Sequence, residues 1–314
     1  MPYFEPVILF FLLGALAGFA RSDLKIPGVL YESLSIFLLL AIGLKGGVEL
    51  ARYPLGEVAL PALAVVLAGA VIPLVAFPIL RRIGKLSRAD AGSIAAHYGS
   101  VSVVTFAVGS TYLARLGNPV EGFMTVFLVL LEFPALVIGV LLARRGEPNT
   151  PWRRVMREVF AGKSIVLLLG GLAIGWIAGP EGFVPLDKLF FDLFKGVLAF
   201  FLLEMGLVAA SRFGDLRRAG LFLVGFATLM PLASAALGLA TGTLLGLSVG
   251  GTTLLATLYA SASYIAAPAA MRIAVPEANP ALSIGAALGV TFPFNLMVGI
   301  PLYHRLAQFL HAGA

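Results

Sequence analysis

Apolar runs of roughly 20 residues recur along the whole chain, and they constrain its fold more than any other feature. Such a run is long enough to cross a bilayer as a helix, and only helices and closed barrels satisfy their backbone polar groups in lipid. The chain is 60% hydrophobic and 12% charged, whereas a soluble domain carries about 25% charged residues. We therefore predict an all-α polytopic membrane protein.

Ten transmembrane spans are expected from these runs. Their approximate boundaries are 4–20, 28–50, 58–80, 90–114, 122–143, 163–178, 186–208, 218–240, 250–271 and 281–304. The first run is short, but no basic residue precedes it, so we expect a retained span and not a cleaved signal.

The two halves of the chain resemble each other. Short patterns of spans 1 to 5 recur in the same order in spans 6 to 10; Ser100-Val101-Ser102, for example, recurs as Ser261-Ala262-Ser263. Five spans are an odd number, so the second half must enter the membrane upside down. We predict 5+5 inverted-topology repeats, as in many secondary transporters. The first repeat covers residues 1–143, a cytoplasmic basic linker covers 144–162, and the second repeat covers 163–314.

The distribution of charge agrees with this topology. With the N-terminus outside, most Lys and Arg residues fall in the cytoplasmic connections, as the positive-inside rule requires. Both termini are then expected outside, and the excess of Lys+Arg (22) over Asp+Glu (16) needs no nucleic-acid partner. The absence of cysteine excludes thiol chemistry, and three scattered histidines predict neither a metal site nor a cofactor. HExxH, GxSxG and paired-aspartate motifs are absent, so an enzyme is not expected.

Two small, polar stretches interrupt spans 4 and 9. Gly, Ser and Pro permit a helix to break, and a break exposes the positive N-terminal end of its second half, which suits an anion. Inverted repeats would bring both breaks together, crossing near the midplane. The alternative is that these are small residues for close helix packing, with hydroxyls bonded to their own helix. The predicted substrate-binding residues are Tyr98, Gly99, Ser100, Val101, Ser102, Val103, Ser261, Ala262, Ser263 and Tyr264.

Two lysines lie in or beside predicted spans. Lys45 is flanked by glycines in span 2, and an ionisable group at membrane depth is a functional candidate by default. Its alternative is snorkelling to the outer interface. Lys195 lies three residues after Asp192 on a predicted helix, so these two are expected to form a local ion pair.

Four further polar residues lie within predicted spans. His97 is interpreted as a structural hydrogen-bonding residue. Glu132 and Glu204 could each pair with a basic group or face a cation. Asn295 could serve a cation site or compensate for the helix kink at Pro293. Together with Lys45, the first three are auxiliary candidates.

Several segments resemble the sodium-dependent bicarbonate symporter family of cyanobacteria. They are Ser22 to Pro27, Ala41 to Gly47, His97 to Phe106 and Thr291 to Asn295. The resemblance implies a homotrimer in a bacterial inner (cytoplasmic) membrane, with Na⁺ as coupling ion and a site between a core and a gate domain. It also implies that anion and Na⁺ bind at Gly99 to Thr105 and at Ser261 to Tyr264. Candidate sodium ligands are Ser100, Thr105, Ser261 and Asn295.

The resulting hypothesis is Na⁺-coupled uptake of bicarbonate by alternating access. A second hypothesis keeps the architecture and changes the cargo to another small monoanion or an organic carboxylate. A third is a non-transporting membrane sensor or scaffold, which predicts tightly packed serine stretches without a cavity. The resemblance further implies a PII-like cytoplasmic regulator, although the central connection here is short.

Overall fold

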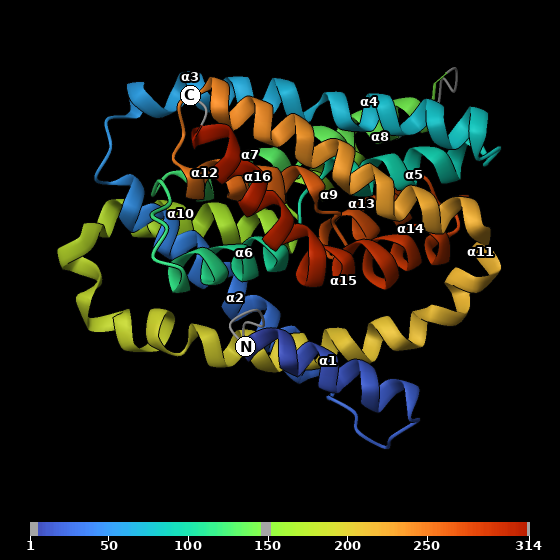
Figure 1. The fold of residues 1–314 in the computed structure, drawn as a ribbon, viewed down its shortest axis with the longest axis horizontal. Coiled ribbons are helices and arrows are strands. Elements are labelled where there is room, and N and C mark those ends of the chain that lie inside the picture. Colours follow the sequence, from blue (N-terminus) through green and yellow to red (C-terminus); the bar gives the residue numbers. More distant parts are fainter. Residues whose placement is uncertain (1–5, 146–151, 313–314) are drawn as a thin grey trace.

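The computed structural model describes residues 6–145 and 152–312 (Figure 1). Over this part of the chain the protein is all-helical and has no strands, which confirms the all-α prediction. The helices are α1 (Pro6–Phe19), α2 (Gly28–Leu50), α3 (Leu55–Gly69), α4 (Val71–Pro78), α5 (Arg88–Gly99), α6 (Val103–Arg115), α7 (Met124–Glu132), α8 (Pro134–Ala143), α9 (Trp152–Phe160), α10 (Lys163–Phe183), α11 (Phe194–Leu244), α12 (Val249–Ala260), α13 (Ala266–Ala274), α14 (Pro280–Ala286), α15 (Phe292–Phe294) and α16 (Ile300–Ala312). Short π-helical or 3-10 segments lie at Ile79–Ile83, Val184–Leu186, Lys188–Asp192, Ala287–Thr291 and Asn295–Gly299.

Eight helices or helix runs within the described residues are long and apolar enough to cross a membrane. They correspond to the predicted spans 2 to 8 and 10. The predicted span 1 coincides with the shorter apolar helix α1, and the predicted span 9 covers the shorter apolar helix α12 and most of α13. The chain is therefore a multi-pass membrane protein by length and composition of its helices.

Proline and glycine set several helix boundaries. Pro27 and Pro54 directly precede α2 and α3. After α6 and α11 the chain turns at Gly117 and Gly246, both with φ of 67°, a left-handed conformation that glycine adopts without strain. In the first of these turns the Asn118 N–H donates to the Leu113 carbonyl at 3.0 Å, which closes the helix end.

Helix α11 consists of two antiparallel limbs. Its helical conformation is interrupted at Gly220, where φ is 83° and ψ is 164°. The chain reverses there, so that residues 194–219 (the first limb) and 220–244 (the second limb) form the two long arms of a U (Figure 1). These limbs correspond to the predicted spans 7 and 8.

Glycines allow four elements to approach each other closely: α1 packs on the first limb of α11, and α2 packs on α10. A Cβ at Gly14 would lie 1.9 Å from the Leu203 carbonyl oxygen, and one at Gly43 would lie 2.6 Å from the Leu168 carbonyl oxygen. Gly206 is constrained in the same way by α1. Any larger residue at these positions would force the backbones apart. We call these four elements the helix quartet.

The two interrupted spans lie at the centre of the molecule. The most apolar stretch of the run from Arg88 to Arg115, which contains α5 and α6, is buried throughout, and so is α12 from Gly250 to Ala260. Helix α12 packs against α16 and α11, while α5 packs against α4 and α8. Both interrupted spans are therefore enclosed by protein, as expected for irregular backbone at membrane depth.

The basic linker contains a helix that the sequence analysis did not predict. Helix α9 lies in this connection and packs against α13 and α8. Residues 146–151 of the predicted linker lie outside the described residues.

Candidate functional site: two crossing helix breaks

The first break separates α5 from α6. Helix α5 ends at Gly99, and Ser100 and Ser102 are extended, with ψ of 163° and 113°. Ser102 then caps α6, because its Oγ accepts hydrogen bonds from the Thr105 N–H at 3.2 Å and the Thr105 hydroxyl at 2.9 Å. Gly99 is needed here because a Cβ would lie 2.6 Å from the Pro73 ring. The predicted break in span 4 is confirmed.

The second break separates α12 from α13. Helix α12 ends at Ala260, and Ser261 is extended, with ψ of 163°. The Ser263 Oγ accepts a hydrogen bond of 3.2 Å from the N–H of Ala267, in the first turn of α13. The serines thus play matching parts in the two breaks. Ser100 and Ser261 follow the last residue of the first helix, and the Oγ atoms of Ser102 and Ser263 each accept an N–H from the first turn of the second helix.

The two breaks bond directly to each other. The Ser102 N–H donates to Ser261 Oγ at 2.8 Å, and the Ser263 N–H donates to the His97 carbonyl at 2.8 Å. Backbone groups freed by one break are therefore satisfied by the other. These two hydrogen bonds bring together the two stretches that the sequence analysis singled out. We call the region that the stretches form, Gly99 to Thr105 and Ser261 to Tyr264, the crossing.

Hydroxyl hydrogens distinguish the four serines of the crossing. The Ser100 hydroxyl donates to the Glu132 carbonyl at 2.9 Å, and the Ser261 hydroxyl donates to the Leu258 carbonyl at 2.7 Å. Ser102 and Ser263 only accept, so within the described structure their own hydroxyl hydrogens are uncommitted. These two serines have a donor left for a ligand.

The helix ends give the crossing opposite partial charges. The first amides of α6, at Val103 and Val104, have no carbonyl one turn earlier in their helix, and this end is positive. The N-terminus of α13 has the same character, whereas α5 and α12 end there with carbonyls. An anion is favoured at the N-termini of α6 and α13, and a cation is favoured at the C-termini of α5 and α12.

Tyr264 is the one predicted substrate-binding residue that is only partly buried; the others are buried. Its hydroxyl is enclosed near Ser102, but it forms no hydrogen bond of good geometry with any described residue. Its ring meets Phe292 edge-on, with centroids 5.2 Å apart. The Tyr98 hydroxyl is instead committed to Thr291 Oγ1 at 2.7 Å. Of the two tyrosines, Tyr264 therefore has the free polar group beside the crossing.

Three of the candidate sodium ligands, Ser100, Thr105 and Ser261, lie in the crossing, and the fourth, Asn295, adjoins it. Thr105 and Ser261 are linked through Ser102, whose hydroxyl and amide they contact. The Asn295 side-chain amide donates to the Ala260 carbonyl at 2.8 Å and accepts from a tyrosine hydroxyl. It therefore secures the end of α12 and does not compensate for the kink in its own helix. Ser100 is turned toward α7, as described above.

The auxiliary residues are spread over the molecule. His97 is fully buried, and its Nδ1 lies 2.7 Å from the Ser93 carbonyl, so Nδ1 carries the proton and donates. Its Nε2 has no partner in the described structure, and neither has Oε2 of Glu132 or Glu204. Pairing with a basic group, one of the two alternatives for these carboxylates, is not found among the described residues.

Two cavities lie on opposite sides of the crossing. The first, of about 560 Å³, is lined by α2, α6, the α6–α7 turn and the segment around Phe191. The second, of about 570 Å³, is lined by His97, α13, the α13–α14 turn and Arg212. None of the four serines lines either cavity.

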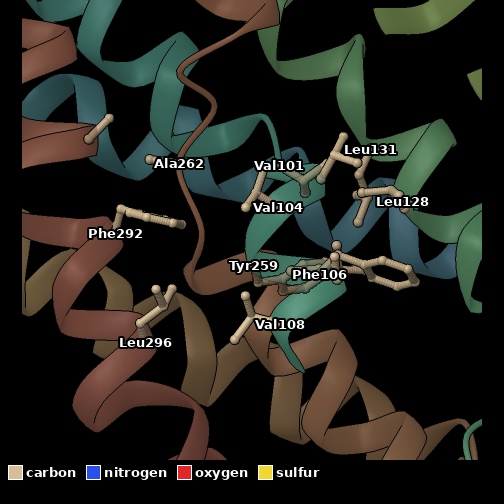
Figure 2. Close-up of a cluster of buried hydrophobic side chains, with 14 of the residues drawn as sticks. Val101, Val104, Phe106, Val108, Leu128, Leu131, Tyr259, Ala262, Phe292 and Leu296 are labelled. Carbon is tan, nitrogen blue, oxygen red and sulfur yellow. The ribbon is translucent and has the colours of Figure 1, made fainter. Parts of the chain in front are cut away.

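Buried apolar side chains surround the crossing and close it off. Val101, Val104, Ala262, Phe292 and Leu296 lie around it, drawn from both broken spans and from the last span (Figure 2). Of this layer, Val101 and Ala262 were among the predicted substrate-binding residues, whereas Val104, Phe292 and Leu296 were missed because they look like any others in an apolar segment. It also missed Arg212 and Arg272, which line the second cavity.

Two broken helices that bond to each other at the centre of a polytopic helical bundle are typical of one class of membrane protein, the transporters. The chain matches the Na⁺-dependent bicarbonate transporter superfamily over residues 6–308, and it belongs to this family. The family resemblance seen in the sequence is thereby confirmed, and the family is one of transporters and not of enzymes. None of the curated proteins matches the chain.

Proposed function

We propose that the protein takes up bicarbonate together with Na⁺ by alternating access, and that the crossing is its binding site. The observation that carries the proposal is the reciprocal bonding of the two breaks, which brings two helix N-termini and two uncommitted serine hydroxyls together. A small anion matches these donors, and membership of a Na⁺-dependent bicarbonate transporter family supports bicarbonate as that anion.

In this proposal the anion and the cation occupy different parts of the crossing. Ser102, Ser263 and the first amides of α6 and α13 hold the anion. Na⁺ takes oxygen ligands, for which we propose Thr105, Ser261, Asn295 and the nearby helix-end carbonyls, with Ser100 in a supporting position. Binding both ions together neutralises the charge that must pass the apolar layer, which is the physical reason for coupling.

The proposed topology is ten spans in two inverted repeats, 1–143 and 163–314, joined by the linker 144–162. Its support lies in matching contacts. Gly14 approaches the first limb of α11 as Gly171 approaches α2. Tyr98 contacts Phe226 in the second limb of α11, and Tyr259 contacts Val65 in α3. An inverted repeat produces such contacts in pairs.

The two cavities support alternating access. Both termini are proposed to lie outside, so the first cavity opens outward and the second opens inward. The helix quartet is the proposed gate, and the rest of the bundle, with the crossing, is the proposed core. A movement of the gate relative to the core would open the crossing to one cavity at a time.

A homotrimer in a bacterial inner membrane and a PII-like cytoplasmic regulator are further proposals, which rest on the family alone.

Uptake of labelled bicarbonate into proteoliposomes tests the proposal. Wild type should require an inward Na⁺ gradient, and Ser263→Ala should raise the KM for bicarbonate about tenfold or more, because it removes one hydrogen bond to a charged ligand. Thr253→Val is the matched control, since the Thr253 hydroxyl donates to the Val249 carbonyl at 2.7 Å within α12, and it should change KM much less. Uptake that is independent of Na⁺ would refute the coupling, and equal KM values for all three proteins would refute the site. Competition by other small anions and organic carboxylates identifies the cargo.

A further inference from the structure

The first cavity carries a charge pattern that the crossing does not use. Four charged side chains line it: Lys45 of α2, Lys195 of α11, Glu49 of α2 and Glu121. Lys45 is exposed although its neighbours Leu44 and Gly46 are buried, so its side chain extends into the cavity from an otherwise enclosed stretch of helix.

Both carboxylates of the cavity have other partners. Glu121 accepts hydrogen bonds from the Ser248 N–H at 2.5 Å and the Ser248 hydroxyl at 3.2 Å, where it lies at the positive N-terminus of α12. Glu49 lies 3.7 Å from Arg52. The charge of Glu49 is therefore paired with that of Arg52, whereas the charge of Glu121 is offset in part by the roughly half positive charge of the α12 N-terminus.

The two lysines have no such compensation in the described part of the chain. The ion pair predicted between Asp192 and Lys195 is not formed, and Asp192 does not line the cavity. The prediction was wrong because Lys195 lies in the first turn of α11, which begins at Phe194, while Asp192 ends the preceding π-helical turn, so the two do not share a regular helix. The hydroxyls of Ser110, Thr111 and Thr125 also line the cavity.

We propose that Lys45 and Lys195 make the first cavity an anion-collecting vestibule, which holds a small inorganic monoanion before it enters the crossing. This inference rests on the proposed function for its direction, since it assigns the vestibule to the entry side. The charge pattern itself can be measured without transport.

A single-cysteine variant measures the field in the vestibule. The chain has no cysteine, so Ser110→Cys in detergent-purified protein gives one reactive thiol on the cavity wall. We compare its rates with an anionic and a cationic methanethiosulfonate. Lys45→Gln and Lys195→Gln should each lower the anionic-to-cationic rate ratio about fivefold at low ionic strength. Lys45→Arg should keep the ratio, and Lys188→Gln, in the same segment but outside the cavity, should leave it unchanged.

Transport then tests the role of the vestibule. Lys45→Gln should raise the KM for bicarbonate about threefold at low ionic strength while kcat stays constant, and the difference should shrink in high salt. Unchanged rate ratios, or a Lys188→Gln effect equal to that of Lys45→Gln, would overturn the inference. If wild type shows no Na⁺-dependent uptake, the proposed function fails, and the thiol rates alone decide whether the vestibule attracts anions.

Discussion

Ser102 has two tasks: it caps α6, and in our proposal it donates a hydrogen bond to the anion. Ser102→Ala removes both, and two measurements tell their effects apart. The Ser102 Oγ caps α6 by accepting the Thr105 N–H, and it accepts the Thr105 hydroxyl as well. Its own hydrogen is the donor that we assign to the anion. The substitution removes all three interactions and leaves the backbone of the break in place.

The expected magnitudes follow from these contacts. Loss of an N-cap serine costs about 1 kcal/mol. The Thr105 hydroxyl, in a residue that is 1% exposed, loses its acceptor, which adds about 1–3 kcal/mol. Loss of a hydrogen bond to a charged ligand costs about 1.5–3 kcal/mol, which weakens bicarbonate binding about tenfold to a hundredfold.

Thermal unfolding in detergent, with and without bicarbonate and Na⁺, measures both effects. Ser102→Ala should lower the unfolding temperature and also lose most of the stabilisation by ligand. Ser87→Ala is the matched control, because Ser87 caps α5 through the Asp90 N–H at 3.0 Å at the far end of the same broken span. It should lower the unfolding temperature and keep the ligand effect. Full ligand stabilisation in Ser102→Ala would refute our assignment of its hydroxyl.

Three further substitutions test the packing around the site. Gly206→Ala should destabilise the helix quartet, because its Cβ would lie 2.1 Å from a carbonyl oxygen of α1, while Gly196→Ala in the same helix meets no atom within 4 Å and should be neutral or stabilising in a thermal melt. Equal melts would contradict this contact. Tyr259→Phe loses the bond of 2.6 Å to the Val65 carbonyl and should cost about 1–3 kcal/mol by the same measurement. Asn295→Ala should lower stability and Na⁺ affinity together, and unchanged Na⁺ affinity would remove Asn295 from the proposed ligands.

The sequence was informative wherever a residue type disagrees with its surroundings. Serines and glycines in an apolar segment predicted both helix breaks, and the recurrence of Ser100-Val101-Ser102 as Ser261-Ala262-Ser263 paired them correctly. The reason is physical: a break at membrane depth requires residues that replace lost backbone hydrogen bonds.

Contacts between side chains could not be predicted in this way. Whether the Ser100 hydroxyl donates to Glu132 or to a ligand depends on a rotation about one bond. The Asp192–Lys195 pair failed because a helix boundary falls between the two residues. The apolar layer around the crossing and the lining of the cavities depend on which faces of distant helices meet, and an apolar sequence does not encode that visibly.

Reciprocal binding of the two ions tests the central claim most directly. The affinity of the purified protein for bicarbonate is measured at low and at saturating Na⁺, and its affinity for Na⁺ is measured with and without bicarbonate. If both ions share the crossing, each should raise the affinity of the other by the same factor, about fivefold or more. Bicarbonate affinity that does not change with Na⁺ would contradict the account.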